Sequence, residues 1–447
     1  MKAGLLSIGV NICRFVVALT FIFSGYVKAI DPLGTQYKIS DYLQAVGLGG
    51  ILPGIATLSL SVFLSALEFF IGILLLFAIN RRIISRIALA FMTVMTAVTF
   101  WLWVADPISD CGCFGDAIHL TNGQTLLKNL VLLGCSIVIA WKPLRMVRFI
   151  SKSNQWIVKN YTALFVILSS VWCLYDLPIF DFRPYHIGAN IPEGMAIPDD
   201  AEQPEFETTF IMEKEGVRKE FTLDNYPDST WTFVDSKSIQ VKEGYVPPIH
   251  DFSITTQEGE DITEEVVNRQ GYTFLLIAPH IEEASDTNFG EIDQLYEYAQ
   301  GKGYPFYCLT ASGEEAIDRW RDLTGAEYPF CTTDEITLKT IIRSNPGLML
   351  IKDGTVIRKW SHNRLPVIET AHFTVPLEKF EIGKMPQDSV PQKILTILVW
   401  FALPLFLLTL ADRTWAWTQW LRRKPLARRM PTRSSRTPHQ RIKTHIY

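Results

Sequence analysis

The stretch Asp110-Cys111-Gly112-Cys113-Phe114-Gly115-Asp116 separates two strongly apolar segments of the chain. It holds two cysteines one residue apart and contains no lysine or arginine. A Cys-x-Cys disulfide closes a very small ring, so it is strained and comparatively oxidising. Gly112 favours such a ring because glycine adopts backbone angles that a side chain would forbid. The stretch therefore predicts chemistry on thiols and disulfides.

Six apolar segments, two of which flank this stretch, are expected to be transmembrane helices. They cover residues 5–30, 55–79, 84–105, 126–141, 161–177 and 394–410. Several approach the lower length limit for crossing about 30 Å of hydrocarbon. The first is too long for the apolar core of a cleaved signal peptide and leads directly into further apolar segments, so we expect it to be retained. The pattern predicts a multi-pass membrane protein.

The lysines and arginines predict the orientation of these helices, because loops rich in them stay in the cytoplasm. They gather in residues 81–86, 142–159 and 413–443. The alternate loops, 31–53 and 106–124, contain only Lys38. With six helices, every basic loop lies on one side, so both termini are expected in the cytoplasm. The Cys-Gly-Cys loop and the acidic region 178–391 then face outward. In a Gram-negative cell this means the inner membrane with a periplasmic domain, where disulfides persist.

The outward-facing region divides into two patterns. Alternating runs at 206–213, 217–223 and 229–234 predict three short strands in a small β-rich segment. A continuous apolar run at 272–278 predicts a buried central strand. It is followed by a helix at 291–300, a strand at 304–310, a helix at 314–323 and a hairpin over 348–352 and 355–360. This order predicts an α/β domain on a mixed sheet.

Three passages of the membrane part resemble the DoxX-like family, and more closely its methylamine utilisation MauE branch. They are Arg14 with residues 23–28 and Asp31-Pro32, then Leu67-Glu68, and finally residues 111–115 with Lys128-Asn129. The resemblance covers roughly residues 5–145 and implies a four-helix membrane bundle. MauE members are associated with maturation of a disulfide-rich enzyme subunit. The resemblance therefore implies a role in extracytoplasmic thiol chemistry, without naming a substrate.

The α/β region resembles thioredoxin-fold domains of the peroxiredoxin and thiol-reductase type. The matching stretches are residues 247–254, 274–278 and 345–354, and the resemblance implies a cis-proline at Pro346. Where the family carries its active cysteine, this chain reads Pro279-His280-Ile281-Glu282-Glu283-Ala284. The standard activity of the fold is therefore not expected, and the domain would act as a docking module.

Together these patterns predict a membrane bundle of five N-terminal helices and one C-terminal helix, with a thioredoxin-like extracytoplasmic domain. The expected parts are a DoxX/MauE-like domain at 1–145, a fifth helix within 146–177, a β-rich segment at 178–245, a thioredoxin-like domain at 246–380, a sixth helix within 385–412 and a basic tail at 413–447.

Cys111 and Cys113 are the candidate redox pair, and Lys128 and His119 are candidates for stabilising a thiolate. The alternatives are a permanent structural disulfide or two unreactive packed thiols. A metal site built from the two cysteines and His119 lacks an evident fourth ligand, so no metal is expected.

Two further pairs of residues are candidates for a redox or a structural role. Cys308 and Cys331 are secondary redox candidates, unless they are simply two unpaired buried cysteines. Arg14 and Glu68 each lie about ten residues, or about 15 Å, from the cytoplasmic end of a helix. An unpaired charge at that depth is costly, so an intramembrane ion pair between them is expected. A structural clamp is favoured over a proton or quinone site.

The leading hypothesis is a membrane thiol–disulfide exchange or maturation factor. Its expected partners are membrane lipid and an extracytoplasmic thiol-containing or thioredoxin-like protein, and a quinone is the candidate electron carrier in the membrane. The basic tail is expected to contact anionic lipid and not nucleic acid. A non-catalytic scaffold for a periplasmic complex is the alternative. A transporter ranks last, because no inverted repeat is evident.

Overall fold

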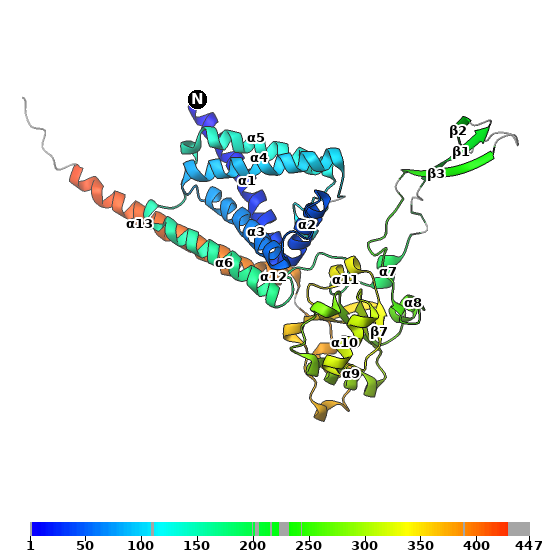
Figure 1. Cartoon of the computed structure of the whole chain (residues 1–447). Helices are drawn as coiled ribbons and strands as arrows, with labels where there is room; N and C mark the ends of the chain where they lie inside the picture. The colour runs from blue at the N-terminus through cyan, green and yellow to red at the C-terminus, as the bar shows by residue number, and fades with distance from the viewer. Residues whose placement is uncertain are drawn as a thin grey trace, which may run out of the picture.

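The computed structural model describes the backbone of residues 2–108, 111–198, 200–201, 205–214, 217–222, 232–242, 244–387 and 389–427. Within these ranges, it describes the side chains of residues 4–201 and 244–422. Figure 1 shows a helical bundle, an α/β domain against one end of it, and a small β-sheet that stands apart from both.

Six helices in the described residues are long and apolar enough to cross a membrane. Five of them precede the α/β domain: α1 Lys2–Ile30, α3 Gly54–Leu76, α4 Arg81–Ala105, α5 Asn122–Trp141 and α6 Gln155–Tyr175. The sixth is the continuous segment formed by α12 Val390–Ile397, a π-helical turn at Leu398–Ala402 and α13 Leu403–Ala427. This confirms the expected arrangement of five N-terminal helices and one C-terminal helix.

Small residues let α1 and α3 pack closely in antiparallel orientation. A Cβ on Gly25 of α1 would lie 2.8 Å from Phe69 Cα, and one on Gly72 of α3 would lie 2.8 Å from Ile22 N. Helices in a membrane associate through such close packing, since lipid tails are as apolar as their side chains. These two contacts fix the register between the helices.

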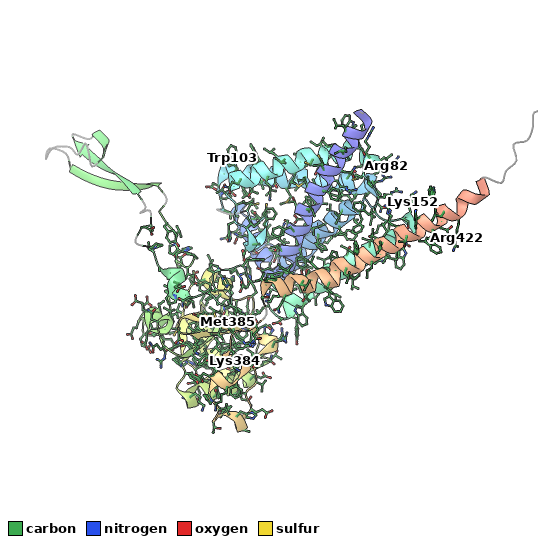
Figure 2. All side chains as sticks on the ribbon, turned by 180° about the vertical axis from the view of Figure 1, so that it is seen from behind. Arg82, Trp103, Lys152, Lys384, Met385 and Arg422 are labelled. Carbon is green, nitrogen blue, oxygen red and sulfur yellow. The ribbon has the colours of Figure 1, made fainter. Side chains whose placement is uncertain are left out.

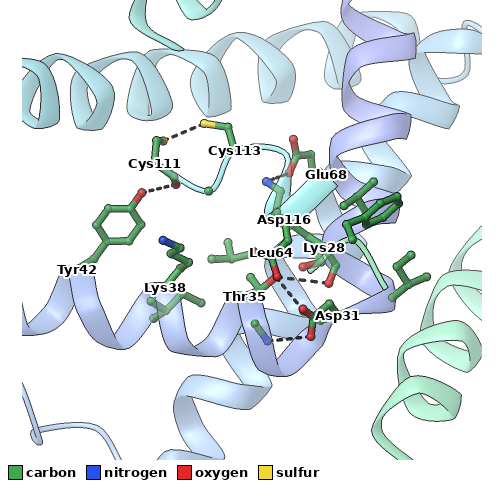
Figure 3. A pocket seen from close by; sticks show the side chains of 18 of the residues that line it. Lys28, Asp31, Thr35, Lys38, Tyr42, Leu64, Glu68, Cys111, Cys113 and Asp116 are labelled. Carbon is green, nitrogen blue, oxygen red and sulfur yellow. Dashed lines mark hydrogen bonds and ion pairs between the residues drawn. The ribbon is translucent and has the colours of Figure 1, made fainter. Parts of the chain in front are cut away.

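Residues 31–53, expected to be a loop, include the helix α2 Pro32–Ala45. Asp31 caps this helix by accepting a hydrogen bond of 2.9 Å from Gly34 N, and Pro32 occupies its first turn. The helix was missed because it has no continuous apolar run. It lies beside the Cys-Gly-Cys loop, as Figure 3 shows.

The basic loops meet at the opposite end of the bundle. Arg81 Nη1 donates to Leu144 O and Met146 O, both at 2.8 Å, and Asp412 accepts a hydrogen bond of 2.8 Å from Ser151 N. Figure 2 shows Arg82, Lys152 and Arg422 on the side of the bundle away from Lys384 and Met385. The basic loops and the α/β domain therefore occupy opposite ends, as counting six helices required.

The α/β domain is built on a six-stranded sheet in the order β4-β7-β6-β5-β8-β9. The strands are β4 Thr255–Thr256, β5 Tyr272–Ala278, β6 Phe306–Thr310, β7 Phe330–Thr332, β8 Gly347–Lys352 and β9 Thr355–Ser361. Strands β5, β6 and β7 are parallel, whereas β8 runs antiparallel to β5 and to β9. The peptide bond between Asn345 and Pro346, just before β8, is cis.

Two apolar cores cover the two faces of this sheet, because successive residues of a strand point to opposite faces. Phe274 and Leu276 pack with helices α9 Phe289–Lys302 and α10 Glu314–Thr324. Leu275 and Ile277 pack with α8 Thr263–Val267 and α11 Glu335–Ile341. Helices on both faces of this strand order make the domain thioredoxin-like, as expected from its sequence.

The separate sheet consists of β1 Glu205–Lys214, β2 Val217–Thr222 and β3 Thr232–Lys242, in the antiparallel order β2-β1-β3. The third strand is longer than the expected 229–234, and residues 229–231 lie outside the described residues.

The α1–α3 contact can be tested by adding one methyl group. We expect Gly25→Ala to destabilise the bundle by about 1–3 kcal/mol, because the new Cβ meets the backbone of α3. Thermal unfolding in detergent measures this, with Gly9→Ala on the same helix as control, since nothing lies within 4 Å of a Cβ there. Equal melting temperatures for the two variants would contradict the packing.

Candidate functional site

The Cys-Gly-Cys loop joins α4 to α5 and is fixed by hydrogen bonds from three helices. Asn122 Nδ2 donates to Ile108 O at 2.8 Å, and Ser24 Oγ donates to Cys113 O at 2.6 Å. The Tyr42 hydroxyl of α2 donates to Cys111 O. Gly112 between the cysteines has φ +63°, a value that L side chains rarely adopt. The loop is therefore held in one conformation.

The two thiols face each other within this loop. Their sulfur atoms are 2.9 Å apart, and Cys111 and Cys113 are only 5% and 9% exposed. The hydrogen bond from Cys113 lowers the pKa of Cys111 to about 7 against the effect of burial, helped by Tyr42 and by the cations of Lys128 and Lys28. The same hydrogen bond and burial raise the pKa of Cys113 well above its ordinary value. The pair thus has one thiol that ionises readily and one that keeps its proton.

The two predicted thiolate stabilisers lie in different places. Lys128 Nζ sits 4.1 Å above the ring of Phe114 and lines a small space beside Cys113. His119 is exposed and does not line the cavity next to the thiols. Of these two residues, Lys128 is the one whose cation lowers the pKa of Cys111.

The expected ion pair between Arg14 and Glu68 is wrong. Glu68 instead binds Lys28 of α1, with Lys28 Nζ 2.5 Å from Glu68 Oε2. The Gly25–Phe69 contact places Glu68 beside the last turns of α1, whereas Arg14 lies about 20 Å further along that helix. Counting residues from the helix ends failed because it ignored the register of the two helices.

Arg14 has a structural role at the other end of the bundle. Its Nη1 donates to Val147 O at 2.6 Å, and its guanidinium lies 4.9 Å from the centre of the Phe149 ring. Both partners belong to the connection between α5 and α6. The guanidinium thus has a carbonyl and an aromatic face as partners, while its Nε and Nη2 have no hydrogen-bond partner among the described residues.

A cavity of about 240 Å³ lies beside the thiols, between α1, α2, α3, α4 and the segment 180–183. Figure 3 shows Cys111, Cys113, Lys38, Tyr42 and the Lys28–Glu68 pair around it. Most of its wall is apolar, and the residues that give it this character are Val27, Ile30, Ile39, Leu64, Phe91, Met95, Val98, Phe180 and Phe182. The space is large enough for one aromatic ring system with small substituents.

Arg183, which lines this cavity, carries an unsatisfied donor. Its Nε binds Asp181 Oδ1 at 2.7 Å, but its buried Nη1 has no hydrogen-bond partner among the described residues. Asp181 in turn accepts a hydrogen bond of 2.9 Å from Lys359 of β9. The segment that closes the cavity is thereby attached to the sheet of the α/β domain.

Cys308 and Cys331 do not form a pair. They lie on the adjacent strands β6 and β7, but Cys308 is opposite Phe330 while Cys331 is opposite Leu309, so their side chains point to opposite faces. They belong to the two separate cores. Burial raises the pKa of Cys331 to about 11 and that of Cys308 further. Their arrangement is that of two buried apolar residues.

The position of the missing thioredoxin cysteines is occupied by a hydrogen-bonded histidine. His280 Nε2 lies 3.0 Å from Glu335 Oε1, and Asn345 Nδ2 donates to His280 O at 2.7 Å. No group of three or more His, Cys, Asp or Glu residues in the described part of the chain could hold a metal ion.

The contacts that α2 and the α/β domain make with the loop were not predicted from the sequence. Asp31 and Tyr42 come from a helix that was not expected, although the Asp31-Pro32 dipeptide is a helix-start signal. Arg183 and Arg343 come from far along the chain, and no local pattern marks them. Residues separated by hundreds of positions meet only through the tertiary structure.

Comparison with known proteins agrees with the membrane motifs. Residues 6–142 match the family model described as Methylamine utilisation protein MauE. Residues 206–243 match a second model, described as Domain of unknown function (DUF8463). No curated protein matches the chain significantly.

One solved structure resembles part of the chain. It is a solution structure from Bacteroides thetaiotaomicron, provisionally described as a protein disulfide isomerase, with 16% identity and a TM-score of 0.21. The match covers 26% of this chain and 76% of that one. The thioredoxin-like fold rests on strand order and helix placement, and not on this weak similarity.

The asymmetry of the two thiols predicts their reactivity. In the reduced protein, alkylation of Cys111 by iodoacetamide should rise with pH and be half-maximal near pH 7, since its pKa is lowered to about 7. Cys113 should react only at higher pH. Lys128→Gln should move the Cys111 midpoint upward, because a cation that favours the thiolate is lost.

Peptide mass spectrometry across a pH series measures both rates. Lys142→Gln, at the far end of α5, is the matched control and should leave the midpoint unchanged. A Cys111 midpoint at or above about 8.5, the value of an ordinary thiol, would contradict the assignment.

Proposed function

We propose, from the MauE match over residues 6–142 and the geometry of the thiol loop, that this membrane protein exchanges thiols and disulfides through Cys111 and Cys113. The observation that carries the proposal is the pair of facing thiols, with one pKa lowered and the other raised, beside a cavity. The substrate class is an extracytoplasmic protein with a disulfide or dithiol, or a thioredoxin-like partner.

The exchange balances as a two-electron, two-proton step. The Cys111 thiolate attacks a partner disulfide, a mixed disulfide forms, and one partner thiolate leaves. Cys113 then loses its proton and attacks the Cys111 sulfur, which releases the second partner thiolate. The chain ends with a Cys111–Cys113 disulfide and the partner with two thiols. The reverse sequence oxidises a partner dithiol.

The cavity supports a second reaction of the same pair with a lipid-soluble quinone. A reduced pair would transfer two electrons and two protons to the quinone, giving a disulfide and a hydroquinone. The apolar wall suits the ring, and Arg183, which lines the cavity, is a hydrogen-bond donor for a carbonyl oxygen. Such a reaction would connect thiol oxidation to the membrane.

The distribution of charge supports the inner membrane of a bacterium as the location. The basic loops lie at the end of the bundle opposite the α/β domain, and such loops stay in the cytoplasm. Both termini would then be cytoplasmic and the α/β domain periplasmic. The thiol loop would face the compartment in which disulfides form.

A non-catalytic scaffold is the second candidate. It is favoured by the α/β domain, because the position of the usual active-site cysteines holds His280, which is bonded to Glu335. The thiol loop has no role in that function, so the two candidates are separated by removing the thiols.

The thiols are tested with Cys111→Ser and Cys113→Ser, alone and together. We expect each variant to lose at least 90% of the wild-type rate of disulfide exchange with a reduced or oxidised model protein, measured in reconstituted membranes. Cys173→Ser is the matched control, because Cys173 is an equally buried thiol of α6. Unchanged exchange in the double variant at normal protein level would favour the scaffold.

The quinone reaction is tested by filling the cavity. Leu64→Trp should lower the rate at which a short-chain quinone is reduced by the dithiol protein about tenfold, because an indole occupies the space for the ring. Leu60→Trp, one turn away on α3 and outside the cavity, should keep the wild-type rate. Absorbance of the quinone gives the rate, and equal rates in both variants would rule out the cavity as its site.

A further inference from the structure

Arg343, at the C-terminal end of α11, connects the α/β domain to the thiol loop. Its Nε lies 3.1 Å from both carboxylate oxygens of Asp31, and its Nη2 lies 3.1 Å from Asp31 Oδ2 and 3.0 Å from Asp116 Oδ2. Asp31 caps α2, and Asp116 ends the Cys-Gly-Cys stretch. One guanidinium from the α/β domain thus binds both elements that surround the thiols.

The surface around Arg343 is shaped to fit it. The Arg343 guanidinium lies 5.3 Å from the ring centre of Tyr37 on α2, and Lys339 Nζ lies 5.0 Å from the same ring. A Cβ on Gly34 would approach Arg343 Nη2 to 2.7 Å, so only glycine leaves room for the contact. The Arg343 side chain is 7% exposed. The interface thus combines the Arg343 cation with the Tyr37 ring and the carboxylates of Asp31 and Asp116.

A second contact between the α/β domain and the bundle has a different character. Arg364 Nη1 binds Asp176 Oδ2 at 2.7 Å at the end of α6, and the Arg364 side chain is 52% exposed. Exposed ion pairs contribute little, because water screens them. This contact lies where the chain leaves the membrane helix, so it follows from connectivity, whereas the Arg343 contact is remote in sequence from both of its partners.

The elements that Arg343 binds also enclose the thiols. Asp31 positions α2, whose Tyr42 binds the loop at Cys111, and Asp116 belongs to the loop itself. The segment 180–183, bound to β9 through Asp181 and Lys359, closes the cavity. In this docked state the thiols border a cavity for a small molecule but do not reach a protein surface.

We propose that the α/β domain is a built-in cap for the thiol loop and that Arg343 is the positioning residue that holds the cap in place. Docked, the thiols are open only to the cavity; undocked, they reach a protein partner. The cap would therefore alternate the pair between a small electron acceptor and a protein substrate. Only this last role rests on the proposed function, because the shielding of the thiols does not require them to be redox-active.

The experiment compares how two reagents reach the reduced thiols of the full-length protein in membranes. Iodoacetamide is small enough for the cavity, whereas a polyethylene-glycol maleimide reaches only open thiols. We expect Arg343→Gln to raise the rate of the bulky reagent relative to the small one at least tenfold, because two carboxylates lose their buried partner. Arg343→Lys should give an intermediate ratio, since an ammonium cannot form the forked contact with Asp31 while binding Asp116.

Arg364→Gln is the matched control, because it removes a different ion pair between the α/β domain and the bundle. Its reagent ratio should equal that of the wild type. Asp116→Asn leaves the α/β domain untouched and keeps the Arg343–Asp31 contact, so it provides a second variant if Arg343→Gln does not fold; its ratio should also rise.

An unchanged ratio in both Arg343→Gln and Asp116→Asn overturns the cap, and so does an equal rise in Arg364→Gln. Alkylation needs no redox partner, so this result is independent of the exchange assay. A serine double variant that retains exchange would refute the proposed function and leave the cap standing. Normal exchange with an unchanged reagent ratio would refute the cap and leave the proposed function standing.

Discussion

A charged group within or beside a membrane bundle needs a partner, because burial without one is costly. The arrangement around the thiol loop follows from this constraint. Glu68 binds Lys28 beneath the loop, and Asp31 and Asp116 share Arg343 above it. Burial would raise the pKa of the Asp181 carboxyl, but Lys359 and Arg183 hold it well below its usual range. Asp181 thereby fixes the segment that closes the cavity. Apart from Asp181 with Arg183, each of these pairs joins elements that are distant in sequence.

The thioredoxin-like domain also contributes to the surroundings of the thiol loop. Its sheet, helices and cis peptide bond are present, but its active-site position holds His280 in place of cysteine. The thiols of the protein lie instead in the membrane part, and the domain contacts their loop through the end of α11. The domain thus presents Arg343 to the thiol loop and carries no cysteine at its own active-site position. This division explains how a domain without active-site cysteines belongs in a chain organised around a thiol pair.

The thiol pair itself depends on its surroundings for its asymmetry. Two adjacent cysteines in a flexible peptide would have similar pKa values. Here Cys111 accepts the hydrogen bond and lies near two lysines, while burial keeps the proton on Cys113. The surroundings alone thereby give the two thiols different tendencies to ionise. The apolar cavity beside them limits which molecules can reach the pair while the domain is docked.

The sequence by itself determined the elements whose signal is local. Apolar length predicted the six membrane helices, the basic loops predicted which ends lie together, and the continuous run at 272–278 predicted the central strand. Family motifs pointed to Cys111 and Cys113. The helix α2 was missed because a short helix at the end of a bundle needs no apolar run to be stable. The Arg14–Glu68 pair was wrong because depth along two helices depends on their register, which close contacts at Gly25 and Gly72 decide.

Only the tertiary structure decided which charges meet. Lys28 with Glu68, and Arg343 with Asp31 and Asp116, are separated by 40 to 312 positions in the chain. Ion pairing depends on distance in space and carries no periodicity along the chain, so composition and spacing could not reveal it. The same holds for Cys308 and Cys331, whose separation onto opposite faces follows from strand register. Local patterns thus determined the parts, and packing determined the site.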